Sequence, residues 1–216
     1  MIQTHNLTFK YKNKEQIFSF PQVNLKVQEN LLILGQSGIG KTTFLHLLAG
    51  LIEPKTGHIT INNIDINTLS SSKLDKFRGE NIGLVFQKKH AIQSLSVSEN
   101  LQARLFFCDK KQRQATINSL LEELNLSDIK NSKVNEISEG QLQRLGIALS
   151  VVHNPQVILA DEPTSSLDDD NCKVVINLLK NQAKKNNANL IVITHDQRIK
   201  PFFQNTITLS TFGRSV

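Results

Sequence analysis

The chain has 216 residues, of which 39% are hydrophobic and 20% are charged, a composition typical of a soluble globular protein. No apolar run approaches the ~18 residues that a membrane-spanning helix needs, and the first residues hold no apolar signal segment, so neither an integral membrane protein nor a secreted one is expected. The net charge of +6 comes from scattered lysines rather than one basic block, so no nucleic-acid partner is expected. Cys108 and Cys172 match no metal-ligand spacing, and we expect two reduced thiols in the cytoplasm.

The first third of the chain predicts half-buried β-strands. Val23, Leu25 and Val27 alternate with polar residues, which is the period of a strand with one buried face. A second alternating run, Ile59–Ile61, is followed by the asparagine pair 62–63 and by the run Ile64–Ile66. The asparagine pair predicts a turn between the two runs.

Four short apolar runs predict strands buried on both faces, and they alternate with helical patterns. The predicted strands are Leu31–Leu34, Ile82–Phe86, Val157–Ala160 and Leu190–Thr194. The predicted helices are one from Lys41 with Phe44, Leu45, Leu48 and Leu51 on one face, one with Ile117, Leu120, Leu121 and Leu124 on one face, one from Ser138, and one over Asp169–Lys185. This alternation predicts a mostly parallel α/β sheet. The stretch from about Val97 to Val152 holds no strand candidate and predicts a helical subdomain.

The segment LLILGQSGIGKTT predicts a phosphate-binding loop. Gly35, Gly40, Lys41 and Thr42 match the spacing G-x-x-x-x-G-K-[ST] between a buried strand and an amphipathic helix. The glycines let backbone N–H groups surround an anion, the lysine reaches the β- and γ-phosphates, and the threonine hydroxyl ligates Mg²⁺. The residues expected to bind ATP in this loop are Gly35, Gln36, Ser37, Gly38, Ile39, Gly40, Lys41, Thr42 and Thr43.

The segment VILADEP places two acids after another buried strand. Asp161 fits the acid that holds Mg²⁺ in P-loop NTPases, and Glu162 fits the general base that activates the attacking water. The alternative is a solvent-exposed acidic turn closed by Pro163. The phosphate-binding loop favours the catalytic interpretation, because ligands of parallel sheets bind at the carboxyl ends of the strands.

Six motifs follow one another in a recognisable order: Gly35–Thr42, Gln87, Ser138–Gln141, Asp161–Glu162, Ser165–Asp168 and His195. With these motifs the chain resembles the ATP-binding-cassette (ABC) ATPases over essentially its whole length. The resemblance implies an α/β fold: a P-loop NTPase (RecA-like) core with an N-terminal antiparallel β subdomain and an inserted α-helical subdomain. It also implies one ATPase domain over residues 1–216, with the helical subdomain at about 89–153.

The segment ISEGQLQR has two interpretations that are compatible. Ser138 and Gln141 have the spacing of a capping box, which begins a helix. In the ABC family this segment is the signature, and the resemblance implies that Ser138, Glu139, Gly140 and Gln141 cover the nucleotide held by a second ATPase subunit. Both accounts are expected to hold, because a well-ordered helix start also presents N–H groups to phosphate.

Glu139 departs from the commonest form of the signature, which has glycine there. A carboxylate about 8 Å from a phosphate charge, at an effective dielectric constant of about 20, is repelled by ~2 kcal/mol. This repulsion exceeds the ~0.3–1 kcal/mol that an acid gains at a helix N-terminus. We therefore expect a weakened dimer rather than an inactive one.

The resemblance assigns four further roles by position. Gln87 is implied to contact Mg²⁺ and the attacking water, and His195 to contact the γ-phosphate and Glu162. Asp168 is implied to orient groups across the dimer interface, and Tyr11 to stack on adenine. The alternatives are structural: a polar residue at a strand end for Gln87, a cap for His195, and simple packing for Tyr11.

Two functions from different classes fit the resemblance. The first is the ATPase subunit of an ABC transporter, peripheral on the cytoplasmic face of the inner membrane, that acts as a homo- or heterodimer and docks on integral membrane permease subunits. The surface from about Lys88 to Phe107 is implied to receive them, and RGENIGLVFQ is most similar to the bacterial lipoprotein-releasing and macrolide-exporter group. The second is a soluble ABC-type ATPase, for example of iron–sulfur assembly. Glu139 alone also suggests a catalytically weak partner in a heterodimer.

Overall fold

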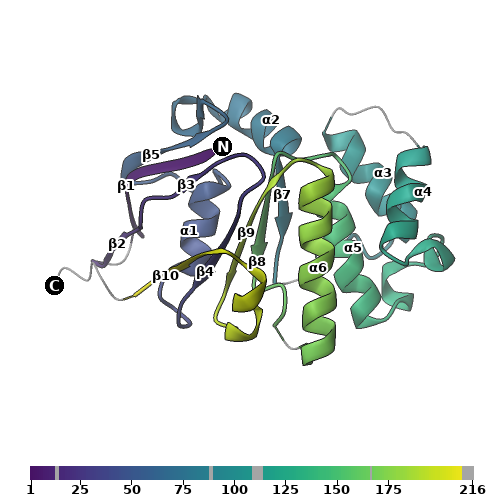
Figure 1. The fold of residues 1–216 in the computed structure, drawn as a ribbon. Helices are drawn as coiled ribbons and strands as arrows, with labels where there is room; N and C mark the ends of the chain where they lie inside the picture. The colour runs from purple at the N-terminus through teal and green to yellow at the C-terminus, as the bar shows by residue number, and fades with distance from the viewer. Residues whose placement is uncertain (13–14, 88–89, 109–113, 166, 211–216) are drawn as a thin grey trace.

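The computed structural model describes residues 1–12, 15–87, 90–108, 114–165 and 167–210, and it contains two β-sheets (Figure 1). One sheet is antiparallel, with strand order β2-β1-β5-β6 and with β3 paired to β1. Its strands are β1 (Ile2–Lys10), β2 (Ile17–Ser19), β3 (Asn24–Leu25), β5 (Thr56–Ile61) and β6 (Ile64–Asp65). The predicted turn lies between β5 and β6, where Asn62 and Asn63 have φ values of 47° and 66°. Two positive φ values are what a tight hairpin turn requires.

The second sheet is parallel, with strand order β10-β4-β9-β8-β7. Its strands are β4 (Asn30–Leu34), β7 (Ile82–Val85), β8 (Val157–Asp161), β9 (Asn189–Thr194) and β10 (Asn205–Thr208). The four predicted buried strands are present within one residue at each end. Every residue of β8 and β9 is buried, because helices cover both faces of the sheet.

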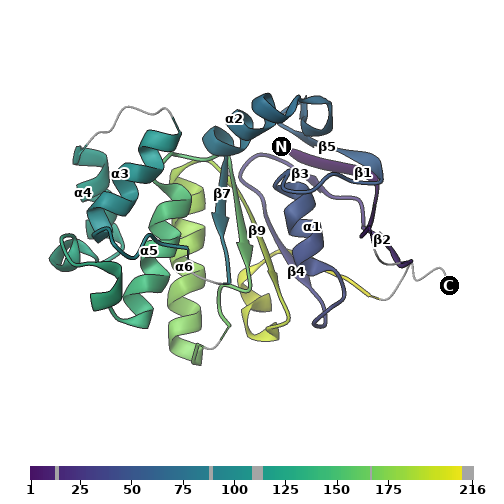
Figure 2. The same cartoon turned by 180° about the vertical axis from the view of Figure 1, so that it is seen from behind.

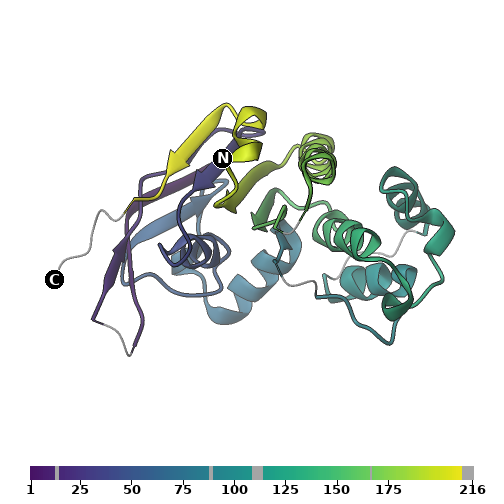
Figure 3. The ribbon, with the colours of Figure 1, turned by 90° about the horizontal axis from the view of Figure 1, so that it is seen from below.

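The helices are α1 (Lys41–Leu48), α2 (Ser71–Asn81), α3 (Val97–Phe107), α4 (Gln114–Glu123), α5 (Glu139–Val151) and α6 (Asp169–Lys185), with 3-10 turns at Ile66–Thr68, Ser127–Ile129, Val134–Glu136 and Gln197–Phe202. Figure 2 shows α1 against the face of the parallel sheet opposite to α6. Alternate residues of each strand therefore join two cores: Ile33 packs with α1, and Leu32 packs with α6. Helices α3, α4 and α5 gather at one side, away from the antiparallel sheet (Figure 3). The predicted α/β fold with an inserted helical part is confirmed.

Two details of the predicted pattern are wrong. The helix that begins at Lys41 ends at Leu48, and Leu51 is 40% exposed beyond it. Gly50 has a φ of 62° and closes the helix, with the N–H of Leu51 donating to His46 O at 2.9 Å. The alternation through Val27 also fails, because the chain turns there and leaves Val27 exposed.

Candidate active site

The phosphate-binding loop connects β4 to α1 and leaves the helix start open. Gly38 and Gly40 have φ values of 77° and 105°, and a Cβ at Gly40 would lie 2.8 Å from the Phe18 ring. Gly40 is the N-cap of α1, and no side chain caps the helix. The first N–H groups of α1 therefore keep their capacity to donate to an anion.

Lys41 lies at the mouth of this loop and is buried. Its Nζ donates to Gly35 O at 2.8 Å and to Gln36 O at 3.0 Å. The same Nζ lies 3.3 Å from Glu162 Oε1. The ammonium group is thus held between the loop and the catalytic acid expected from the sequence, where a phosphate bound in the loop would meet it.

Thr42 and Asp161 form a pair of oxygen ligands that fits Mg²⁺. Thr42 Oγ1 donates to Asp161 Oδ2 at 2.9 Å. The other oxygen, Asp161 Oδ1, is buried and has no hydrogen-bond partner among the described residues. Burial raises the pKa of Asp161, and the Thr42 hydrogen bond opposes that rise only in part. A hard divalent cation would satisfy the buried oxygen and offset the cost of its burial.

Glu162 directly follows β8 and has a φ of 48°, a left-handed conformation that is uncommon for a glutamate. Its Oε2 accepts from Thr194 Oγ1 at 2.6 Å, and its Oε1 lies 3.0 Å from His195 Nδ1. Burial on its own raises the pKa of Glu162, but the hydrogen bonds from Thr194 and His195 and the charge of Lys41 lower the pKa overall. The side chain is therefore a carboxylate at neutral pH, which is the form that accepts a proton.

A cavity of about 360 Å³ opens over these groups. Its lining includes Tyr11, Ser37, Gly38, Gly40, Lys41, Thr42, Thr43, Gln87, Glu162 and His195. The structure thus brings the loop, the glutamate after β8, the histidine after β9 and the exposed Gln87 after β7 to one place at the carboxyl edge of the parallel sheet. Asp161 is not among the described lining residues, but it accepts a hydrogen bond from Thr42, which is. Sequence reasoning missed Thr194, whose buried hydroxyl holds Glu162.

Tyr11 is at the rim of the cavity. Its hydroxyl shares a hydrogen bond of 2.8 Å with Thr43 Oγ1, and its ring meets the Phe9 ring edge-on at 4.7 Å. The ring is 39% exposed, so it packs on one side and offers surface on another. The predicted stacking on adenine stays a prediction.

The signature segment lies outside this cavity. Ser138 Oγ accepts from Gln141 N at 3.3 Å, and Gln141 Oε1 accepts from Ser138 N at 2.8 Å, which is the predicted capping box at the start of α5. Glu139 and Gly140 are exposed. Among the described lining residues of the cavity, none belongs to Ser138–Gln141. The contact expected between this segment and a nucleotide held by a second subunit stays a prediction.

Asp168 is the N-cap of α6. It accepts hydrogen bonds from Asn171 N at 2.8 Å and Asn171 Nδ2 at 2.9 Å, and these bonds lower the pKa of Asp168. Of the motif Ser165–Asp168, Ser166 lies outside the described residues. The role of Asp168 across a dimer interface stays a prediction.

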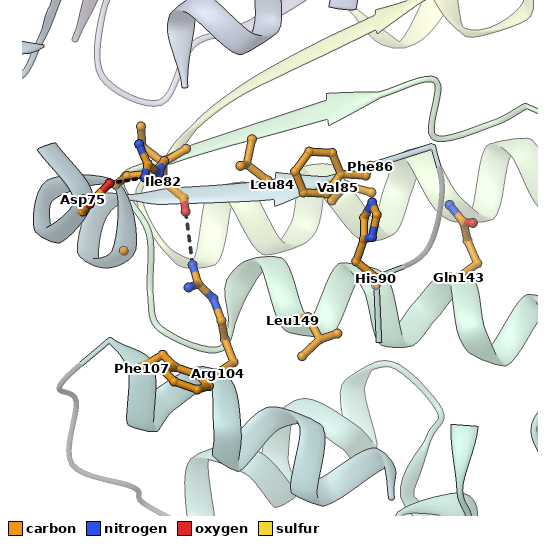
Figure 4. A pocket seen from close by; sticks show the side chains of 13 residues that line it. Asp75, Ile82, Leu84, Val85, Phe86, His90, Arg104, Phe107, Gln143 and Leu149 are labelled. Carbon is orange, nitrogen blue, oxygen red and sulfur yellow. Dashed lines mark hydrogen bonds and ion pairs between the residues drawn. The ribbon is translucent and has the colours of Figure 1, made fainter. Parts of the chain in front are cut away.

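A second cavity, of about 430 Å³, lies where α2, β7, α3 and α5 meet (Figure 4). Phe86, His90, Arg104 and Phe107 line it, and the Phe107 side chain is 76% exposed. Arg104 is held in place by Ile82 O at 3.5 Å and by His153 Nε2 at 3.2 Å. The surface predicted to receive membrane subunits overlaps this cavity, although Lys88 and Lys89 lie outside the described residues. In the part of the chain that the structure describes, no helix has the length and apolar character needed to cross a bilayer.

Comparison with known proteins places the chain in a family. Residues 20–165 match the profile of the family described as ABC transporter. The lipoprotein-releasing system ATP-binding protein LolD of Buchnera aphidicola (from Acyrthosiphon pisum) is 35% identical over 202 residues, which cover 91% of this chain and 88% of that protein. The uncharacterized ABC transporter ATP-binding protein MJ0796 of Methanocaldococcus jannaschii is 36% identical over 97% of this chain and 93% of its own length.

Solved structures agree with this placement. The dimeric post-hydrolysis state of the MJ0796 ATP-binding cassette, bound to ADP and Pi, has a TM-score of 0.87 and 32% identity, and the match covers 100% of this chain and 97% of that one. CbiO1 of Clostridium perfringens, part of the transporter complex CbiONQ, has a TM-score of 0.86 at 25% identity over 97% of this chain and 84% of that one. The open helix start beside Lys41, the acid pair after β8 and the capped signature helix thus occur in a chain that belongs to the ABC transporter family, as one of its ATP-binding ATPase subunits.

Proposed function

We propose that the residues around the first cavity hydrolyse ATP in the presence of Mg²⁺. The observation that carries this assignment is the cluster of Lys41, Glu162 and His195 next to an uncapped helix N-terminus. Backbone N–H groups and Lys41 bind the phosphates, and Thr42 with Asp161 would hold Mg²⁺. The cation would supply neutralisation of phosphate charge.

Glu162 is assigned as the general base. It takes a proton from water while the water oxygen bonds to the γ-phosphorus and the bond from that phosphorus to the β–γ bridging oxygen breaks. Thr194 and His195 keep the carboxylate ionised and oriented. In the proposed mechanism His195 and Gln87, which line the same cavity, contact the γ-phosphate and the water. Most of the rate enhancement comes from position and charge, because phosphoryl transfer asks for little covalent chemistry from the protein.

The Glu162→Gln substitution tests this assignment. It removes the base and keeps the size of the side chain, so we expect turnover to fall by ~10²–10⁴-fold while Mg²⁺-dependent ATP binding persists. Steady-state phosphate release measures the first quantity and calorimetry the second. Full hydrolysis by the Gln variant would remove Glu162 from this role, and a wild-type chain that takes up no ATP with Mg²⁺ would overturn the whole proposal.

Two ATPase subunits face each other head to tail in the proposed active form, and the signature of each covers the cavity of the other. This arrangement is supported by the described lining of the cavity, which includes no residue of Ser138–Gln141 from the same chain, and by the dimeric state of the related cassette. The second subunit is another copy of this chain or a homologous partner.

The proposed output is movement of a substrate by separate integral membrane subunits, with this chain on the cytoplasmic face of the inner membrane and with no nucleic-acid partner. The relatives named for lipoprotein release support the membrane partner. The second cavity is the proposed docking site, since Phe107 and Phe86 offer an apolar surface flanked by Arg104.

Cell fractionation of a Phe107→Asp variant tests the docking site. A buried charge opposes docking, so we expect this variant to leave the membrane fraction in which the wild-type chain is found. The matched control is Val174→Asp, which places the same charge on an exposed valine of α6. A wild-type chain that stays out of the membrane fraction would favour the soluble alternative, an ATPase not coupled to transport.

A further inference from the structure

A continuous chain of hydrogen bonds leads away from Glu162 toward the start of α6. Thr194 Oγ1, which donates to Glu162, also accepts from Asp196 N at 3.0 Å. Asp196 in turn accepts from Arg198, with Nε 2.9 Å from Oδ1 and Nη2 2.8 Å from Oδ2. This two-pronged pairing of a guanidinium with a carboxylate fixes the orientation of both groups.

The other side of the Arg198 guanidinium binds the loop that follows Glu162. Its Nη1 donates to Asp169 Oδ1 at 2.5 Å, and its Nη2 donates to Leu167 O at 3.2 Å. These two acceptors flank Asp168, the residue expected to act across the dimer interface. Arg198 therefore binds the backbone carbonyl of the residue before Asp168 and the side chain of the residue after it.

A second link ties the same two segments together. The buried hydroxyl of Thr164 donates to Asp196 Oδ2 at 3.1 Å. The loop from Glu162 to α6 is thus fixed near its beginning by Thr164 and at its end by Arg198. Asp196 accepts hydrogen bonds from both of these residues. The four hydrogen bonds that Asp196 accepts from Arg198 and Thr164 outweigh its partial burial and lower its pKa to about 2.

We infer that Arg198 is a positioning residue for ATP hydrolysis, because it joins the turn that carries His195 to the loop that carries Asp168. The inference rests on the proposed function and extends it to a residue outside the recognised motifs. Through Asp196 and Thr194, Arg198 also keeps the Glu162 carboxylate and the partner-facing loop in one arrangement. Lysine cannot replace it, because an ammonium group lacks the planar fork that reaches two carboxylates and a carbonyl together.

Stability measurements separate positioning from a general structural role. The side chains of Arg198 and Asp169 are 44% and 74% exposed, and an ion pair exposed to this degree adds little to folding stability. The Asp196 side chain is only 11% exposed, so its pairing with Arg198 adds more, and loss of Arg198 should lower the melting temperature moderately while the protein stays folded at the assay temperature. The fall in turnover should therefore exceed any fall that an unfolded fraction would cause. It should also leave ATP binding unchanged, because the contacts that the structure gives Arg198 all lie outside the phosphate-binding loop.

The test compares Arg198→Ala, Arg198→Lys and the control Lys173→Ala in the full chain. Lys173 Nζ lies 3.3 Å from Asp170 Oδ1. Asp170 is in the first turn of α6, next to the Asp169 that Arg198 binds, and both side chains of this control pair are exposed. For Arg198→Ala we expect kcat to fall by about ten- to a hundredfold, KM for ATP to stay within about twofold, and the melting temperature to fall by less than about 8 °C. Arg198→Lys should recover only part of the loss, and Lys173→Ala should match the wild type.

The inference would be overturned by an unchanged kcat in Arg198→Ala, by an equal loss in Lys173→Ala, or by a loss that comes with a larger rise in KM or a larger fall in melting temperature. Full activity of Arg198→Lys would remove the two-pronged geometry from the explanation and would equally overturn it. These results differ from a failure of the proposed function, in which the wild-type chain itself shows no Mg²⁺-dependent turnover.

Discussion

The starts of α1 and α5 are both positive ends of helices, yet the sequence finishes them in opposite ways. At α1 the N-cap is Gly40, no side chain caps the helix, and the first residue is the cation Lys41. At α5 the N-cap is Ser138, the capping box is closed, and the first residue is the acid Glu139. A cation is unfavourable at a helix N-terminus and an acid is favourable.

This difference shows which helix start is complete without a ligand. At the α5 start the capping box satisfies the N–H of Gln141, and Glu139 lies favourably at the positive end of the helix, so this start is ordered whether or not a nucleotide is present. The α1 start has no side-chain cap and no acid in its first turn, and a bound anion would supply both interactions. The phosphate-binding loop is therefore incomplete without an anion, whereas the start of α5 is ordered by its own capping box.

The largest effect that separates the two starts should come from Lys41→Ala. Loss of a charged hydrogen bond to phosphate costs ~1.5–3 kcal/mol, so we expect ATP affinity to weaken by about 10- to 100-fold. Ligand binding raises stability through mass action, so the upward shift of melting temperature that ATP gives the wild type should be mostly lost. Thermal unfolding with and without ATP measures this shift.

The control for Lys41→Ala is Lys76→Ala, which removes an exposed lysine of α2 paired with Glu80. The control should keep the full shift of melting temperature. If Lys41→Ala also kept the full shift, anion binding at the start of α1 would not depend on the charge of Lys41. The contrast between α1 and α5 would then rest on their caps alone.

A smaller effect should come from Ser138→Ala, and the chain supplies a matched control. Ser96 begins α3 with the same capping box, in which its Oγ accepts from Glu99 N at 3.2 Å and Glu99 Oε2 accepts from Ser96 N at 2.7 Å. Either serine-to-alanine change should cost ~1 kcal/mol of folding stability through the lost cap. Only Ser138→Ala should also lower ATP turnover, by about tenfold, since one charge-assisted hydrogen bond to phosphate is worth ~1.5 kcal/mol or more.

Unfolding in urea and phosphate release measure the two quantities for each variant. Equal turnover in Ser138→Ala and Ser96→Ala would mean that the signature serine is a cap and nothing more. That result would contradict the expected contact with a nucleotide in a partner subunit.

The same contrast explains how much the sequence could reveal. The motif of the phosphate-binding loop spans only Gly35–Thr42, and the capping box spans only Ser138–Gln141. Each is local in sequence, so its spacing alone predicts it. The buried strands were predictable too, because helices on both faces leave continuous apolar runs. The antiparallel pairing of β1 and the fifth parallel strand β10 are long-range consequences of packing that no local pattern marks.

Contacts between distant side chains were out of reach for the same reason. Thr194 and Glu162 are 32 positions apart, and Arg198 and Asp169 are 29 positions apart. Both pairs meet only because β8 and β9 lie side by side in register, with Asp161 opposite Ile193. The errors at Leu51 and Val27 arose where a turn overrode an apolar period.

The smallest expected effect concerns the acid in the first turn of α5. Glu139→Gly removes a carboxylate that repels a partner's phosphates by up to ~2 kcal/mol, but an exposed side chain swings away and is screened, so we expect turnover to rise only a few-fold. The change also forfeits the ~0.3–1 kcal/mol that the acid gains from the helix dipole, which a small fall in the urea midpoint would show. Glu139→Gln is the control, because it removes the charge without adding backbone freedom, and it should give the same rise. A large loss of turnover in the Gly variant would mean that the acid assists the contact between subunits. The starts of α1 and α5 would then differ in their caps, but the charge of Glu139 would not oppose the binding of phosphate.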